Sequence, residues 1–192
     1  MVDSMAGVVL AAGAGRRYGM PKALVEYEGR LLVERAADTQ HRGGCAPVVV
    51  VLGAAAEQVW AAAVLAGSVV VENPGWGSGM GSSLRVGLAA LAGADVSAAV
   101  VTLVDLPGVG PEAVRRVAGR GSPDALVVAG YGAAGHRWGH PVLLGRDHWP
   151  GVVELAVGDT GARPYLQAHA AEVQVVPCGD VADDRDVDLP PR

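Results

Sequence analysis

The chain has 192 residues, of which 51% are apolar, and its formal net charge is −5. This length fits one domain, residues 1–192, with enough apolar residues for a real core. Lys and Arg are dispersed, whereas nucleic-acid grooves and patches that bind acidic membranes need them clustered. We therefore expect no nucleic-acid partner and no membrane partner, and a polyanionic ligand must be met by a few local cations and backbone amides.

The cysteine pattern and the N-terminal residues predict a cytoplasmic location. Cys45 and Cys178 lie far apart and form no C-x-x-C pair, which argues against a disulfide framework and a zinc site. The opening MVDSMAGVVLAAG lacks the basic region of a signal peptide. The sequence also has no run of about 18 apolar residues without a breaker.

Short β-branched runs alternate with Ala- and Leu-rich segments of helical length. The predicted strands are Ala6–Ala12, Pro47–Gly53, Ser68–Glu72, Ala98–Val104, Ala125–Ala129 and Val173–Val176. The predicted helices are Leu31–Arg42, Ala55–Leu65, Ser82–Ala92, Pro111–Gly119 and Thr160–Ala170. Because several strands are Val-rich without alternation, we predict an α/β fold with a Rossmann-like, doubly wound, mostly parallel sheet. Ligands of such sheets bind beyond the carboxyl ends of the strands.

Two segments interrupt this alternation. Tyr131–Pro150 is rich in Gly, His and Trp, and we expect an insertion over the site there. Gly179–Arg192 is polar with prolines at its end, which is typical of a tail.

The first strand runs directly into GAGRRYGMPK, residues 13 to 22. Glycines let backbone N–H groups approach phosphate oxygens, and nearby cations add charge-assisted contacts. The candidate phosphate contacts are the backbone of Gly13, Ala14 and Gly15 and the side chains of Arg16, Arg17 and Lys22. The alternative is a plain glycine turn with solvated basic residues. A Walker loop is excluded because its lysine is followed by Ser or Thr, whereas Lys22 precedes Ala23. A dinucleotide-binding fingerprint is excluded because the glycine spacing differs from G-x-G-x-x-G and because the second strand ends in Gly53, without the acidic residue that this motif requires.

Asp105 follows the central strand within LVDLP. A carboxylate at this strand end lies where ligands bind, and Mg²⁺ takes one or two carboxylates plus substrate phosphates. The alternative is an ordinary turn or N-cap residue before the helix at Pro111.

Three later segments carry further candidates. In ENPGWGSGMGSSL, we expect Ser82 or Ser83 to cap a helix whose N-terminus holds an anion, the alternative being an ordinary capped loop. His140 is a candidate general base or phosphate contact, although a lone histidine is more often structural. Arg163, in the first turn of a helix, is a candidate for the acceptor phosphate, and the alternative is a surface arginine.

These segments resemble the MobA-like nucleotidyltransferase family. LAAGAGRRYGMPK resembles L-A-A-G-x-S-x-R-M-G-x-x-K, with Gly15 where Ser is common and Tyr18 where Met is common. LVDLP resembles the metal-binding L-x-D-x-P element. The NPGWGSGMGSSL, GHPVLLGRD and GDTGAR segments resemble elements of the molybdenum-cofactor cytidylyltransferase branch. RDVDLP, which starts at Arg185, resembles the C-terminal D-I-D-T-P element, but Pro191-Arg192 replaces the usual Glu-Asp.

The resemblance implies a sheet of the nucleotide-diphospho-sugar transferase type and transfer of CMP from CTP, or of a nucleotide from another triphosphate, to a small phosphorylated acceptor. The implied acceptor is the molybdenum-cofactor pterin, and a molybdoenzyme is an implied partner. The implied catalytic residues are Lys22, Arg17 and Asp105, and the Mg²⁺ ligands are Asp105 with Asp186 or Asp188. The implied nucleotide contacts are Leu10, Ala11, Ala12, Gly13, Ala14, Gly15, Arg16, Lys22, Gly79 and Ser83, and the acceptor contacts are Trp76, His140 and Arg163.

Two other functions stay open. The same branch resembles nicotine blue oxidoreductases, which use NAD(P)H, and a non-enzymatic carrier of the molybdenum cofactor is a second alternative. Sugar-phosphate and methylerythritol-phosphate nucleotidyltransferases share the chemistry of the first interpretation.

Overall fold

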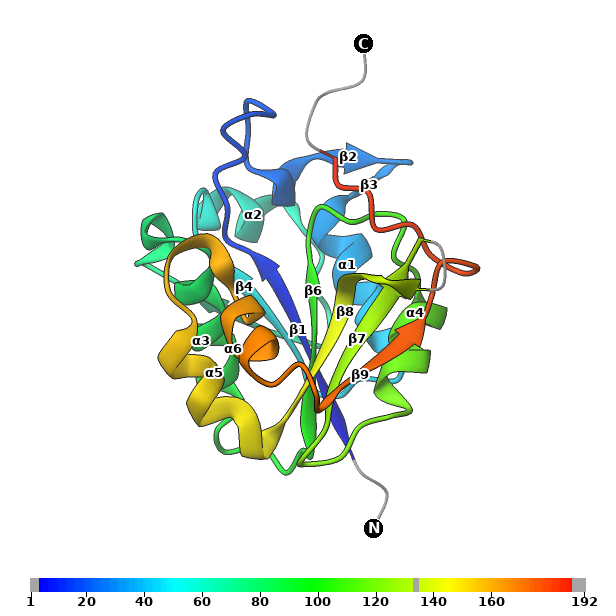
Figure 1. The fold of residues 1–192 in the computed structure, drawn as a ribbon. Helices are drawn as coiled ribbons and strands as arrows, with labels where there is room; N and C mark the ends of the chain where they lie inside the picture. The colour runs from blue at the N-terminus through cyan, green and yellow to red at the C-terminus, as the bar shows by residue number, and fades with distance from the viewer. Residues whose placement is uncertain (1–3, 133–134, 188–192) are drawn as a thin grey trace.

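The computed structural model describes residues 4–132 and 135–187, in which seven strands form one sheet (Figure 1). The strand order is β5-β4-β1-β6-β8-β7-β9. The strands are β1 (Met5–Ala11), β4 (Val48–Leu52), β5 (Ser68–Glu72), β6 (Ala98–Leu103), β7 (Leu126–Tyr131), β8 (Arg137–Gly145) and β9 (Val173–Pro177). Within the described part of this seven-stranded sheet, β8 alone runs antiparallel to its neighbours. The predicted doubly wound, mostly parallel sheet is confirmed.

Helices cover both faces of the sheet (Figure 1). They are α1 (Leu32–Arg42), α2 (Ala56–Ala62), α3 (Met80–Ala90), α4 (Pro111–Ala118), α5 (Trp149–Leu155) and α6 (Arg163–Ala168). Buried side chains of α1, α2 and α4 share one apolar cluster, and those of α3, α5 and α6 share the other. A short hairpin, β2 (Glu26–Tyr27) and β3 (Arg30–Leu31), precedes α1 and was not predicted.

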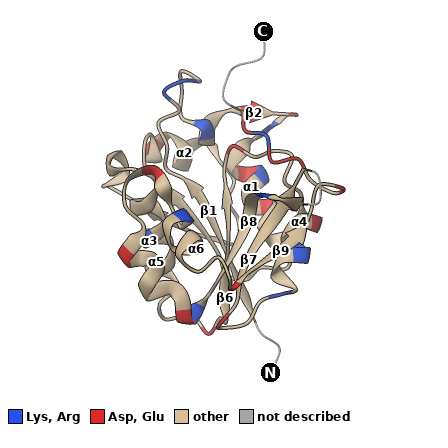
Figure 2. Ribbon diagram, viewed as in Figure 1, with Lys and Arg blue, Asp and Glu red and all other residues tan. Residues whose placement is uncertain are grey.

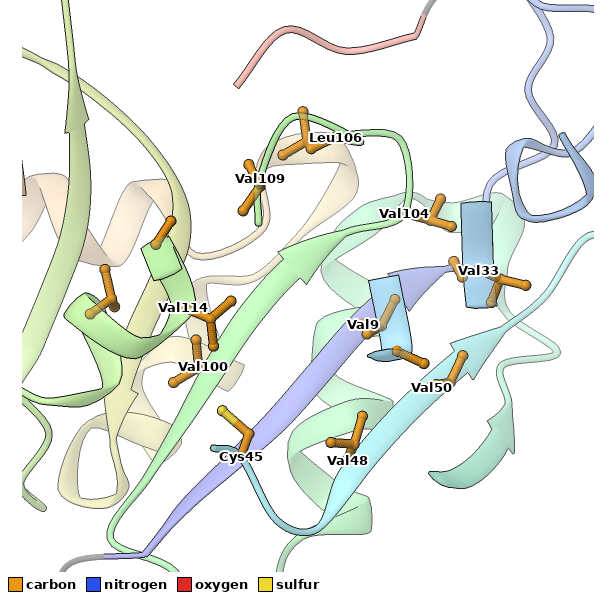
Figure 3. Close-up of a cluster of buried hydrophobic side chains, with 14 of the residues drawn as sticks. Val9, Val33, Cys45, Val48, Val50, Val100, Val104, Leu106, Val109 and Val114 are labelled. Carbon is orange, nitrogen blue, oxygen red and sulfur yellow. The ribbon is translucent and has the colours of Figure 1, made fainter. Parts of the chain in front are cut away.

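The valine runs lack alternation because both faces of the strands are covered. In β4, Val48 and Val50 face the α1 side, whereas Val49 and Val51 face the α3 side. All four are fully buried. Figure 3 shows the first cluster, with Val33 and Val114 close to valines of the strands. Burying each such side chain contributes about 1.5–3 kcal/mol.

The expectation of an insertion at Tyr131–Pro150 is wrong. This segment contains β8, which is placed between β6 and β7, and it leads into α5. The first residues of β8 are partly or fully exposed, and only Pro141–Gly145 is buried. Because half of the strand faces solvent and a cavity, its sequence shows no continuous apolar run.

The sheet order brings two predicted functional segments together. β1 lies between β4 and β6, and Leu10 pairs in register with Leu103. The loop after β1 and the turn after β6 therefore leave the same end of the sheet, side by side. Figure 2 shows basic residues in the loop after β1 and acidic residues in the C-terminal segment at that end.

Candidate active site

Two adjoining cavities lie at the carboxyl ends of the parallel strands. The first has a volume of about 420 Å³, and the loop Gly13–Arg17 and Lys22 line one side of it. The second has a volume of about 480 Å³ and lies over β6, β7 and β8. Asp105 and Asp159 line both cavities, so the two spaces meet at these carboxylates.

The loop after β1 is closed by a backbone hydrogen bond from the Gly19 amide to the Gly15 carbonyl, 2.9 Å long. Gly15 has φ +59°, and a Cβ atom there would overlap the Met20 carbonyl oxygen. The serine that is common in the family pattern does not fit this loop conformation, which explains the departure at Gly15. Arg16 and Arg17 are exposed and line the first cavity, as a phosphate loop requires.

Lys22 and Asp105 form an ion pair at the junction of the cavities. The Lys22 Nζ atom donates to Asp105 Oδ2 at 2.7 Å, and the two side chains are 14% and 18% exposed. Asp105 does not cap α4, because the residue at that N-cap is Gly110. Asp105 lies in the turn after β6, so only the N-cap part of the alternative is excluded. The pair joins the two residues expected to act on phosphate and metal.

The start of α3 differs from the prediction. The helix begins at Met80 after Gly79, so neither Ser82 nor Ser83 is its cap. Both serines lie inside the helix, where their hydroxyl groups accept hydrogen bonds of 2.8 and 3.0 Å from the buried side-chain amide of Asn73.

Asp159 contacts the N-terminus of α3. Its Oδ1 atom accepts a hydrogen bond from the Met80 amide at 3.3 Å. A Cβ atom on Gly79 would lie 2.8 Å from the same oxygen, so a glycine leaves room for this carboxylate. Asp159 was not predicted as a site residue, although it belongs to the GDTGAR segment that was singled out.

The second cavity has an apolar floor and a polar rim. Leu84, Val101, Val128, Val142 and Leu144 contribute to the floor. His140, Arg163, Arg137, Asp184 and Asp186 are among the rim residues. Arg163 is the first residue of α6 and is exposed.

His140 is neutral at physiological pH. Burial is the largest cause and lowers its pKa to about 4; Asp105 and Asp184 partly oppose this shift, and Arg163 adds a smaller lowering effect. A neutral imidazole offers one hydrogen-bond donor and one acceptor to a ligand, without a charge.

The C-terminal residues are not a free tail over the described range. The Val187 amide donates to the Asp105 carbonyl at 3.0 Å, and the Asp183 amide donates to the Gly108 carbonyl at 3.1 Å. Asp186 thereby borders the second cavity together with Asp105. Asp188 lies outside the described residues.

The residues present fit a magnesium ion held jointly with a substrate. Residues 4–132 and 135–187 contain no group of three His, Cys, Asp or Glu side chains that would make a site by themselves. Asp105 and Asp186 offer two carboxylates at one cavity. Mg²⁺ is commonly bound by one or two carboxylates, with substrate phosphates and water completing its octahedron.

Most other predicted residues line the cavity expected of them, with two differences. Leu10 lines both cavities, and Ala12, Gly79 and Ser83 line the first. Ala11 is buried in the core and lines neither cavity. Trp76, predicted to contact the acceptor, lines the first cavity. None of the helices in the described part of the chain has the length and apolar character that a bilayer span requires.

Comparisons with known proteins agree with this arrangement. Residues 7–173 match the family model described as the MobA-like NTP transferase domain. The chain is 42% identical over 187 residues to the nicotine blue oxidoreductase of Paenarthrobacter nicotinovorans, a match that covers 95% of this chain and 91% of that protein.

Solved structures give the same result. Rv0371c from Mycobacterium tuberculosis H37Rv is similar with a TM-score of 0.82 and 31% identity, over 98% of this chain and 94% of that chain. A complex of Rv0371c with manganese has a TM-score of 0.76 and 31% identity, over 96% and 94% of the two chains. The chain therefore belongs to the MobA-like NTP transferase family.

Proposed function

We propose that this protein is a Mg²⁺-dependent nucleotidyltransferase that transfers CMP from CTP to the phosphate of the molybdenum-cofactor pterin and releases pyrophosphate. The observation that carries the proposal is the Lys22–Asp105 pair at the junction of two cavities. One cavity has a phosphate-type loop for the triphosphate. The other has space for an acceptor whose phosphate reaches the same junction.

The chemistry needs alignment and charge neutralisation more than it needs proton transfer. An acceptor phosphate oxygen attacks the α-phosphorus of CTP, and the bond from that phosphorus to the bridging oxygen of pyrophosphate breaks. Backbone amides of the Gly13–Gly15 segment bind the β- and γ-phosphates. Arg17 and Lys22 balance the charge that develops on the transferred group.

Asp105 and Asp186 would hold Mg²⁺, which when bound neutralises the phosphate oxygens. Lys22, which donates to Asp105, would also be available to the α-phosphate of a bound nucleotide at the junction of the cavities. The crystal of Rv0371c with manganese supports a divalent metal in this relative, and we extend that metal to the present chain.

His140 acts as a neutral hydrogen-bond partner of the acceptor ring. A phosphate acceptor is already anionic at neutral pH, so the reaction requires no strong general base. The apolar floor of the second cavity suits a flat heterocycle, and Arg163 at its rim suits the phosphate. A molybdoenzyme that receives the finished cofactor is the proposed protein partner.

The second candidate is an NAD(P)H-dependent reduction of a pigment. It is favoured by the 42% identity to the protein named nicotine blue oxidoreductase, and the second cavity also suits a flat pigment. It is disfavoured because β4 ends at Leu52 and is followed by Gly53 and Ala54, without the acidic residue that binds the ribose of a dinucleotide.

The deciding experiment compares the two reactions in one preparation. The protein is incubated with Mg²⁺, CTP and molybdopterin, and pyrophosphate release is measured, while a parallel sample receives NADPH and nicotine blue. We expect pyrophosphate release that disappears in Asp105→Ala. NADPH oxidation without pyrophosphate release would contradict the proposal, and stoichiometric pterin binding without either reaction would identify a carrier.

A further inference from the structure

The C-terminal strap, which we define as residues 179–187, follows β9 and runs back across the site end of the sheet (Figure 1). Two ion pairs attach it to the body of the protein. Arg116 pairs with Asp180 near the start of the strap, and Arg137 pairs with Asp184 near the cavity. The strap also forms the backbone hydrogen bonds from Asp183 and Val187 described above.

The Arg137–Asp184 pair has the geometry of a rigid clamp. Two nitrogens of the guanidinium group donate to the two carboxylate oxygens, each at 2.6 Å. The Asp184 side chain is only 8% exposed, although Arg137 lies at the surface. Such two-pronged pairs fix orientation as well as distance.

Two glycines in the segments that contact the strap leave space for its close approach. A Cβ atom on Gly139, in β8, would lie 2.5 Å from Asp184 Oδ2 and 2.9 Å from the Tyr131 ring. A Cβ atom on Gly108, three residues after Asp105, would overlap the Asp183 carbonyl oxygen. Glycines in β8 and in the turn after β6 therefore both permit close approach of the same strap.

The clamp lies two residues before Asp186, which is exposed and forms no hydrogen bond or ion pair with residues 4–132 or 135–187. We propose that Arg137 and Asp184 are positioning residues that hold Asp186 opposite Asp105, so that both carboxylates reach one metal–nucleotide complex. The inference rests on the proposed function. In this proposal the Arg137 side chain binds Asp184, and Arg163 binds the phosphate of the acceptor.

The test uses the full-length protein and the matched variants Asp184→Asn and Asp180→Asn. Each removes one carboxylate charge from an arginine pair of the strap, but only the first pair borders the cavity. Free Mn²⁺ is measured by its electron paramagnetic resonance signal during titration, with and without CTP, and thermal unfolding checks that each variant is folded. We expect Asp184→Asn to weaken Mn²⁺ binding in the presence of CTP at least tenfold, with metal-free CTP affinity unchanged, and Asp180→Asn to match the wild type.

A double-mutant cycle tests whether Asp184 affects metal binding through Asp186 or independently of it. If Asp184 acts through Asp186, then Asp186→Asn shows the same loss and the double variant shows no further loss. Three results would overturn the inference and leave nucleotidyl transfer standing. They are additive losses of Mn²⁺ affinity in the double variant, equal losses in Asp184→Asn and Asp180→Asn, and an unchanged Mn²⁺ affinity in Asp184→Asn. A rise in acceptor KM in Arg137→Lys with Mn²⁺ affinity unchanged would overturn it too, because Arg137 would then contact substrate. Absence of CTP-dependent Mn²⁺ binding in the wild type would overturn the proposed function itself.

Discussion

At the scale of single residues, the ion pair of Lys22 with Asp105 joins the segment after β1 to the turn after β6. The two residues are 83 positions apart, and their side chains are mostly buried. Removing one member of a mostly buried pair leaves the other charge poorly solvated, so such substitutions perturb more than one contact. Asp105 variants should therefore always be compared with a variant outside the site.

The base preference depends on Ala12 beside the first cavity. Ala12 is 6% exposed, and a Cβ atom built on Gly53 would lie 2.8 Å from the Ala12 methyl and 2.6 Å from Trp76 Cβ. The Ala12 methyl and Trp76 Cβ therefore both lie close to Gly53, and both residues line the first cavity. We predict that CTP–Mg²⁺ binds at least tenfold more tightly than GTP–Mg²⁺, which is about 1.4 kcal/mol, and that Ala12→Gly narrows this gap.

Calorimetric titration of both nucleotides checks this prediction. Ala11→Gly is the matched control, because it makes the same change one residue earlier at a position that lines neither cavity. Equal affinities in the wild type, or a preference for GTP, would remove the cytidylyl assignment.

His140 predicts a specific pH dependence of stability. An unfolded histidine titrates near a pKa of about 6.5, whereas burial lowers the pKa of His140 to about 4. Between these values the unfolded chain binds a proton that the folded chain does not bind. The free energy of unfolding therefore falls as the pH drops from about 6.5 towards 4, by at most about 1.4 kcal/mol per pH unit from this group.

We expect His140→Gln to lose less stability than the wild type between pH 7.5 and pH 5. Urea unfolding at both pH values gives the difference. His136→Gln changes an exposed histidine just before β8 and serves as the control, which should follow the wild type. Parallel losses in wild type and His140→Gln would show that His140 is not held neutral.

At the scale of elements, the close packing of α3 against β1 and β4 limits the size of the side chain that position 87 of the helix can have. A Cβ atom on Gly87 would lie 2.7 Å from Val8 Cγ1 and 3.2 Å from Val51 Cγ2, and both valines are fully buried. Overpacking of this kind costs about 1–3 kcal/mol, against about 1 kcal/mol gained in helix propensity. We predict that Gly87→Ala lowers the free energy of unfolding by up to about 2 kcal/mol.

Denaturant unfolding of Gly87→Ala and Gly93→Ala measures this cost. A Cβ atom on Gly93, just after the same helix, would have no neighbour within 4 Å, so this control should stay within about 0.5 kcal/mol of wild type. A Gly87→Ala variant as stable as the wild type would mean that α3 can shift away from the sheet.

Local sequence predicted the strands that consist of a short valine-rich run, including β5 and β9, which are only partly buried, and it failed for β8, which has no such run. The run Pro47–Gly53 contains β4, because every residue of that strand is apolar and covered on both faces. β8 was missed because its first half includes the exposed Arg137 and Trp138 and the partly buried His140. Only its pairing with β7 makes that half a strand.

The same distinction holds for the site. The loop after β1 and Asp105 could be predicted, since each lies within a contiguous motif next to a strand end. The contacts of Asp159 with Met80 and of Arg137 with Asp184 join residues 79 and 47 positions apart. No local pattern encodes such pairs, so the cap of α3 and the clamp on the strap required the fold.

At the scale of the whole molecule, the site unites the N-terminal loop, the centre of the chain and its C-terminal strap. A ligand that bridges the Gly13–Arg17 loop and Asp105 therefore opposes global unfolding. At CTP–Mg²⁺ concentrations 100-fold above the dissociation constant, the stabilisation is about 2.7 kcal/mol. For a chain of this size, we predict a rise in Tm on the order of 5–10 °C.

Differential scanning fluorimetry checks this rise, and chelation of the metal with EDTA should reverse it. Asp105→Ala should show no rise with CTP–Mg²⁺, whereas Asp180→Asn should retain it. An equal rise with EDTA present would mean that CTP binds without a metal.

The antiparallel strand β8 has a consequence for synthesis of the chain on the ribosome. Residues 5–103 supply β5, β4, β1 and β6, which pair with one another in that order. One edge of β6 then stays unpaired, because its other neighbour in the sheet is β8 and not β7, the next strand in the chain. Until residue 145 has emerged, the nascent protein exposes a strand of Ala, Val, Thr and Leu whose unpaired backbone can template association with another chain. Protection of this edge by a chaperone is therefore most useful between the emergence of β6 and that of β8.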